Sequence, residues 1–147
     1  MSESDDTGNN KLLQFSVMND LREIAVAADR IDEFCSMHGL PPSTAYAVNL
    51  SVDELLTNTI SYGYEDSDEH RIDLTIRLDA GVLAIEISDD GIEFAPDSAK
   101  DPDTEASIED RPIGGLGIFL TRQMMDSFDY RRDEGRNIVT LTKKTGT

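Results

Sequence analysis

The stretch "DELLTNTISYGY", Asp53–Tyr64, ends what the spacing of apolar residues predicts to be one long helix. It places Glu54 and Asn58 four residues apart, which is about one helical turn, shortly before Gly63. Asn is a poor residue for a helix interior because its amide competes for backbone hydrogen bonds. An exposed Asn would be ordinary solvated surface, whereas a buried Asn needs a partner. The stretch alone leaves both interpretations open.

The residues before this stretch extend the predicted helix to about 42–62. Its apolar stripe, at spacings of three and four residues, consists of Ala45, Val48, Val52, Leu55, Thr59 and Tyr62. Glu54 and Asn58 fall on a second stripe, which Ser51 and Ser61 continue. We therefore expect a helix with a core side and a polar side, the polar side carrying a carboxylate above an amide.

Periodicity predicts the elements around this helix. They are strands at 11–18, 70–79 and 82–89, helices at about 20–38 and 115–126, and two strands around a turn at 133–135. Asp20 with Glu23 resembles a capping box at the start of the first helix. The predicted fold class is α+β, a two-layer sandwich in which three helices cover a mixed, mostly antiparallel sheet of about five strands.

Length and composition limit the possible functions. The chain has 147 residues, which suits one domain, expected at 11–144 after a disordered acidic tail at 1–10. The net charge of −17 would repel nucleic acid. It is compatible with a basic protein surface or a nucleotide carrying Mg²⁺ as partner, and equally with acidity that serves only solubility or adaptation to salt. The single cysteine, Cys35, excludes an intrachain disulfide and fits a reducing cytosol. We expect a cytoplasmic protein, since neither a secretory signal nor a membrane-spanning apolar run is present.

The regular pattern stops between the third strand and the third helix. This acidic segment predicts a lid at about 92–113, bracketed by Gly91 on one side and by Gly114, Gly115 and Gly117 on the other. Glycines directly before a helix expose backbone N–H groups, which can hold phosphate, although tight packing of the helix start is an alternative explanation. The stretch is not a P-loop, because no Gly-Lys-Ser/Thr follows the glycines.

The stretch "SDDGIEF", 88–94, places a carboxylate at the end of a predicted strand, with a glycine two residues later. A carboxylate there can accept a hydrogen bond from the exocyclic amine of a base, and the glycine leaves room for the ring. Calcium is excluded for the neighbouring acidic run at 101–112, because Ala106 stands where the turn glycine of an EF-hand loop belongs.

The order of these motifs resembles the Bergerat-fold (GHKL) ATPases, and more closely the anti-sigma-factor serine-protein kinases, with their histidine kinase-like ATPase domain. The matching stretches are "DELLTNTISYGY", "DDGIEFAP", "GGLGIFLTRQMMD" and "GRNIVTLTKK". The resemblance covers residues 11–144 and implies ATP and Mg²⁺ as cofactors. It implies that the Asn58 side-chain oxygen binds Mg²⁺ and that Glu54 is the general base.

The same resemblance assigns the rest of the nucleotide site. It implies that Asp89, with Gly91 beside it, binds the adenine amine. It implies that a strand threonine, Thr140, helps to hold adenine through water. The backbone turn implied to hold the phosphates consists of Gly114, Gly115, Leu116 and Gly117.

The resemblance implies an ATP-dependent protein-serine kinase that acts as an anti-sigma factor in bacterial partner switching. Its substrate would be a small anti-anti-sigma protein of the STAS type, and it would sequester a sigma factor and form a homodimer. The alternative is a non-catalytic, nucleotide-loaded switch module that docks on a sigma factor, a phosphatase or another regulator. Glu54 favours the kinase, because a pure binding module needs no base.

Overall fold

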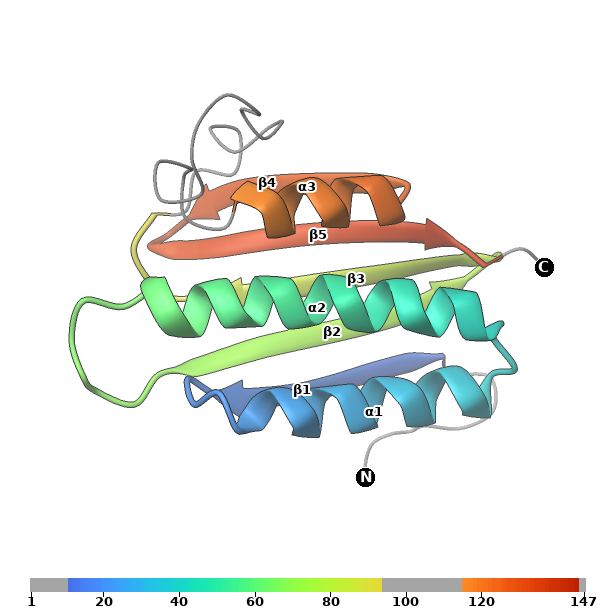
Figure 1. Cartoon of the computed structure of the whole chain (residues 1–147), viewed down its shortest axis with the longest axis horizontal. Helices are drawn as coiled ribbons and strands as arrows, with labels where there is room; N and C mark the ends of the chain where they lie inside the picture. The colour runs from blue at the N-terminus through green and yellow to red at the C-terminus, as the bar shows by residue number, and fades with distance from the viewer. Residues whose placement is uncertain (1–10, 94–114, 146–147) are drawn as a thin grey trace.

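Three helices lie across one face of a five-stranded sheet in the computed structural model, which describes residues 11–93 and 115–145 (Figure 1). The elements in chain order are β1 (Leu12–Met18), α1 (Glu23–Met37), α2 (Pro42–Tyr62), β2 (Arg71–Asp79), β3 (Val82–Asp89), α3 (Gly115–Met124), β4 (Ser127–Asp133) and β5 (Arg136–Lys144). The sheet order is β1-β2-β3-β5-β4, and all four described strand pairs are antiparallel. The predicted two-layer α+β class is confirmed, with an antiparallel rather than a mixed sheet.

Strand alternation determines which face of the sheet the helices cover. In β2 the fully or almost fully buried residues are Ile72, Leu74 and Ile76, and the intervening side chains are more exposed. A strand points successive side chains to opposite faces, so the apolar set forms one continuous floor. Burying one such Leu or Ile side chain stabilises the fold by about 1.5–3 kcal/mol. The helices supply the other half of this core.

Helix α2 lies between α1 and α3 over the middle of the sheet (Figure 1). Its predicted bounds of 42–62 are confirmed, but the predicted side of the helix is wrong for two residues. Ser51, expected on the polar side, is fully buried, and Tyr62, expected on the core side, is 53% exposed. Two flanking helices widen the buried arc of α2 beyond a single stripe, and Tyr62 is the last residue of the helix.

The start of α1 differs from the predicted capping box. The Arg22 backbone N–H donates to Asp20 Oδ1 at 2.9 Å, and the Met18 N–H donates to Glu23 Oε1 at 3.1 Å. Glu23 therefore reaches past Asp20 to the end of β1, and α1 begins at Glu23. The carboxylate thus connects the first strand to the first helix.

Some predictions concern residues that the structure does not describe. The expected tail at 1–10, Gly114 and most of the expected lid lie outside the described residues. Within 11–93 and 115–145, no helix is both long enough and apolar enough to cross a membrane.

Candidate functional site

The sequence motifs meet at one end of the molecule. The carboxyl end of α2, the end of β3, the start of α3 and the start of β5 lie together there (Figure 1). Antiparallel pairing of β3 with β5 brings Asp89 opposite Asn137, and α3 packs against α2. Segments far apart in sequence therefore build one site.

Glu54 and Asn58 lie on α2 and are both half-buried. Asn58 Nδ2 is buried, and no described residue hydrogen-bonds the Asn58 side chain. Ser51 Oγ and Thr121 Oγ1, which are buried on α2 and α3, also lack a partner among the described residues. A buried polar group without a partner costs about 1–3 kcal/mol. The helix pair thus holds polar groups that are suited to a polar ligand.

The oxygen atoms of Asn58 and Glu54 suit a nucleotide that is bound together with Mg²⁺. Mg²⁺ prefers oxygen ligands, keeps several waters and takes few ligands from the protein. The uncommitted amide of Asn58 can offer one such oxygen, and the Glu54 carboxylate stands one turn earlier on the same helix. These two residues fit the cofactors that the sequence implied.

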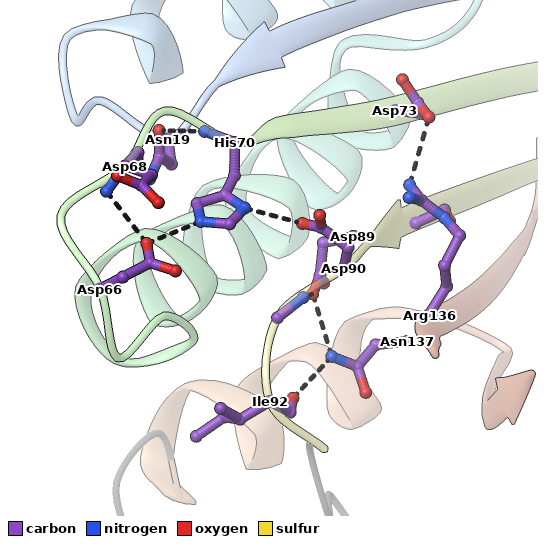
Figure 2. Close-up of polar contacts among 12 residues, drawn as sticks. Asn19, Asp66, Asp68, His70, Asp73, Asp89, Asp90, Ile92, Arg136 and Asn137 are labelled. Atoms are coloured by element: carbon purple, nitrogen blue, oxygen red, sulfur yellow. Dashed lines mark hydrogen bonds and ion pairs between the residues drawn. The ribbon is translucent and has the colours of Figure 1, made fainter. Parts of the chain in front are cut away.

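Asp89 is the last residue of β3 and is only 5% exposed. Its Oδ1 accepts from the Gly91 backbone N–H at 2.8 Å and from Asn137 Nδ2 at 2.9 Å (Figure 2). Among the described residues, none donates to Oδ2. One carboxylate oxygen is therefore fixed by the protein, and the other can accept a hydrogen bond from a ligand.

Gly91 is required by a close backbone contact. A Cβ atom there would lie 2.4 Å from the Gly63 carbonyl oxygen, which is closer than real Cβ atoms approach any atom. The same carbonyl accepts from the Ile92 N–H at 2.8 Å. The sequence suggested that this glycine leaves room for a base. The structure shows that it lets the turn after β3 pack on the end of α2.

His70 holds the same turn from the opposite side to Asn137 (Figure 2). Its Nε2 lies 2.8 Å from Asp66 Oδ1, and its Nδ1 lies 3.1 Å from Asp90 Oδ1. The Tyr64 ring stacks on the imidazole, with 4.1 Å between the ring centroids. The hydrogen bond to Asp66, followed by the charges of Asp66 and Asp90, raises the pKa of His70 against a smaller opposing effect of burial. An imidazole can donate to two carboxylates only when it is protonated.

Asn137 is a site residue that the sequence reasoning missed. It is 2% exposed and lies on the face of β5 that carries Val139 and Leu141 into the core. Strand alternation could have indicated it, because Asn137 occupies an inward position of the closing strand. An amide at such a position needs polar partners.

Thr140 does not lie with Asp89. The register pairs Thr140 with Glu86 of β3 and with Asp129 of β4. Asp89 pairs with Asn137, three residues from Thr140, and an odd step along a strand reverses the face. Thr140 therefore lies on the face of the sheet opposite to Asp89 and the helices.

The glycine-rich helix start is confirmed as a helix start, since α3 begins at Gly115. Gly115, Leu116 and Gly117 form its first residues, at the same end of the molecule as the end of α2 (Figure 1). The N–H groups of a first helical turn have no partner within the helix and lie at the positive end of its dipole. Their role toward phosphate remains a prediction.

A model of the histidine kinase-like ATPase domain matches residues 17–143 of this chain. The chain belongs to that family. This confirms the resemblance seen in the motifs, and ATP is the nucleotide that this ATPase family implies.

Two curated relatives of this histidine kinase-like ATPase domain are protein kinases. The serine/threonine-protein kinase BtrW of Bordetella bronchiseptica is 32% identical over 97 residues, which cover 66% of this chain and 68% of BtrW. The serine-protein kinase RsbW of Listeria monocytogenes is 28% identical over 100 residues, which cover 65% of this chain and 63% of RsbW. The match thus spans slightly less than two thirds of the RsbW chain.

A solved structure shares the fold. It contains the RsbU and RsbW domains of Rv1364c from Mycobacterium tuberculosis, and it superposes with a TM-score of 0.63 at 13% identity. The superposition covers 90% of this chain and 32% of that chain. At this identity the similarity shows the fold alone.

Proposed function

We propose that the chain is an ATP-dependent serine-protein kinase whose nucleotide binds between α2, the end of β3 and the start of α3. The observation that carries the proposal is the arrangement of polar groups at one end of the fold. No described residue donates to Asp89 Oδ2 there, and none hydrogen-bonds the Asn58 amide on α2. Asp89 Oδ2 would accept from the adenine amine, and the Asn58 oxygen would bind Mg²⁺. Gly114, Gly115, Leu116 and Gly117 would supply the backbone groups for the phosphates.

Glu54 is the proposed general base. Its carboxylate would accept the proton of a substrate serine hydroxyl while the hydroxyl oxygen forms a bond to the γ-phosphorus. The bond between that phosphorus and the β,γ-bridging oxygen breaks, and ADP leaves with the electron pair. Bound Mg²⁺ would neutralise the negative charge on the phosphates. Positioned bases of this kind contribute about 10²–10⁴-fold to a rate.

The proposed substrate is a small anti-anti-sigma protein of the STAS type, and the proposed sequestered partner is a sigma factor. The support is the kinship with RsbW and BtrW, which are both named as protein kinases. A net charge of −17 also suits a partner with a basic surface. A homodimer is part of the same proposal. The non-catalytic switch module is not favoured, because the relatives are kinases and Glu54 is present.

The test is transfer of label from γ-labelled ATP with Mg²⁺ into proteins of the host, with wild type and Glu54→Gln side by side. We expect wild type to label a small protein on serine and Glu54→Gln to lose at least about 100-fold in rate. ATP binding by both proteins is the control, and it should differ by less than about threefold, since a base contributes to the transition state. Equal labelling by Glu54→Gln would refute the assignment of the base. If wild type binds ATP but labels no protein, the non-catalytic module would be correct.

A further inference from the structure

Asn137 connects three segments at the base end of the proposed site. It lies at the start of β5, 48 residues from Asp89 in sequence, and its side chain points toward the turn that follows β3 (Figure 2). Its neighbours in this network are Tyr130 and Arg132 of β4. The inference below rests on the proposed binding of ATP.

The side-chain amide of Asn137 is fully engaged by the protein. Nδ2 donates to Asp89 Oδ1 at 2.9 Å and to the Ile92 carbonyl at 2.8 Å. Oδ1 accepts from Tyr130 Oη at 2.7 Å and from Arg132 Nη1 at 2.9 Å. An amide has two donor hydrogens and two acceptor lone pairs, and these four bonds engage both its nitrogen and its oxygen. Asn137 is thus placed to orient Asp89 and the turn that follows it.

The same network fixes the backbone around Asp89. Arg132 Nη1 also donates to the Gly91 carbonyl at 2.9 Å, and the Gly91 N–H donates to Asp89 Oδ1 at 2.8 Å. The turn is therefore bonded to β4 and β5 through one amide and one guanidinium. Rotation of the Asp89 carboxylate would break its bonds to both Gly91 and Asn137.

The charge of the donor also matters. A neutral amide orients the Asp89 carboxylate and leaves its negative charge in place. A lysine paired directly with Asp89 would neutralise that charge. The carboxylate then keeps its strength as an acceptor at Oδ2, where charge-assisted hydrogen bonds are about twice as strong as neutral ones.

We propose that Asn137 is a positioning residue for base recognition, which holds the Asp89 carboxylate so that Oδ2 selects a purine with an exocyclic amine at position 6. Asn137 acts through Asp89. Its contribution to binding affinity therefore depends on which base the nucleotide carries, and the contacts with the phosphates stay the same. The prediction concerns selectivity in addition to affinity.

The first test measures binding of ATP and of inosine triphosphate, which carries a keto oxygen in place of that amine. We expect Asn137→Ala to bind ATP about tenfold more weakly and inosine triphosphate within about threefold of wild type. Asn49→Ala is the matched control, because Asn49 Nδ2 also donates to a carboxylate, Asp32, but on the α1 side of α2. It should leave both affinities within about twofold. Equal losses for both nucleotides in Asn137→Ala would overturn the proposal.

A double-mutant cycle with Asp89→Ala tests whether Asn137 acts through Asp89. In that background Asn137→Ala should have little further effect on ATP affinity, since the group that it positions is gone. Independent, additive losses would overturn the positioning role.

Tyr130→Phe removes one donor to Asn137 Oδ1 with little change in shape, and we expect a smaller loss of ATP selectivity, about two- to threefold. This variant tests the network even if Asn137→Ala folds poorly.

Amide hydrogen exchange in the nucleotide-free protein separates this inference from the proposed function. We expect exchange at Gly91 and Ile92 to accelerate at least about tenfold in Asn137→Ala and to stay unchanged in Asn49→Ala. A wild-type protein that binds no ATP would overturn both proposals. Wild-type ATP binding together with unchanged selectivity and exchange in Asn137→Ala would overturn only the role of Asn137.

Discussion

The two ends of the proposed nucleotide site are built differently. At the base end, the Asp89–Ile92 turn is bonded to α2, to β4 and β5, and to the loop before β2. At the phosphate end, the side-chain Nδ2 of Asn58 is buried and has no partner among the described residues. The described bonds thus fix the backbone turn at the base end, whereas the Asn58 amide on α2 has no such bond within the described residues. Preorganisation at the base end lowers the cost of ordering on binding.

Gly91→Ala is expected to lower both the stability of the base end and the affinity for ATP. The added Cβ would collide with the Gly63 carbonyl and separate the turn from α2. Overpacking of this kind costs about 1–3 kcal/mol, and the displaced Asp89 should also weaken ATP binding about tenfold or more.

Urea unfolding and ATP titration measure the two effects of Gly91→Ala. Ser61→Ala is the control, because Ser61 is exposed near the end of the same helix and its loss should change stability by less than about 0.5 kcal/mol. A Gly91→Ala protein as stable as wild type would mean that the contact with Gly63 does not hold the turn.

Asn58→Ala is expected to separate function from stability at the phosphate end. Asn58 has no partner among the described residues, and alanine is a better helix former, so the variant without nucleotide should be as stable as wild type or up to about 1 kcal/mol more stable. Binding of ATP with Mg²⁺ should weaken about tenfold, because one oxygen ligand is lost.

The comparison with Asn137→Ala makes this prediction sharp. The same substitution at Asn137 removes four satisfied hydrogen bonds and should lower the free energy of unfolding by about 1–3 kcal/mol. If Asn58→Ala destabilised the nucleotide-free protein as much as Asn137→Ala does, the contrast between the two ends would be wrong.

The smallest expected effect concerns the pH dependence of the base end through His70. Its pKa in the folded protein is raised above the ordinary 6.5, chiefly by the hydrogen bond to Asp66, with Asp90 facing its other nitrogen and Tyr64 stacked on its ring. The imidazolium therefore stabilises the fold fully below about pH 6.5, and this stabilisation is lost as the pH rises through the raised pKa.

Urea midpoints for wild type and His70→Gln across this pH range measure that contribution. The advantage of wild type should be constant at acidic pH, below the ordinary pKa, and should shrink at higher pH. Asp66→Asn should remove most of the pH dependence, since it removes the main cause of the shift. A difference between wild type and His70→Gln that grows as the pH rises would contradict the assignment.

Much of the fold could be predicted because its signals are local. Alternation in "HRIDLTIRLD" identified β2, and the three- and four-residue spacing of apolar residues gave α2 its bounds. Burial around α2 was predicted less well, since Ser51 is fully buried and α2 packs against both α1 and α3, an arrangement that local periodicity does not reveal. Candidate site residues on α2 and at the end of β3 were found through their motifs, and their roles remain to be tested.

The sequence by itself determined the secondary structure, the order of the motifs and the family, because periodicity and motif spacing are encoded within short segments. Only the tertiary structure decided which of these residues meet. The pairing of β3 with β5 sets Asn137 beside Asp89 and turns Thr140 to the other face. The packing of Gly91 on Gly63 joins α2 to the turn after β3. Such contacts depend on strand register and on the close approach of distant segments. Neither property can be predicted from any single stretch of the chain.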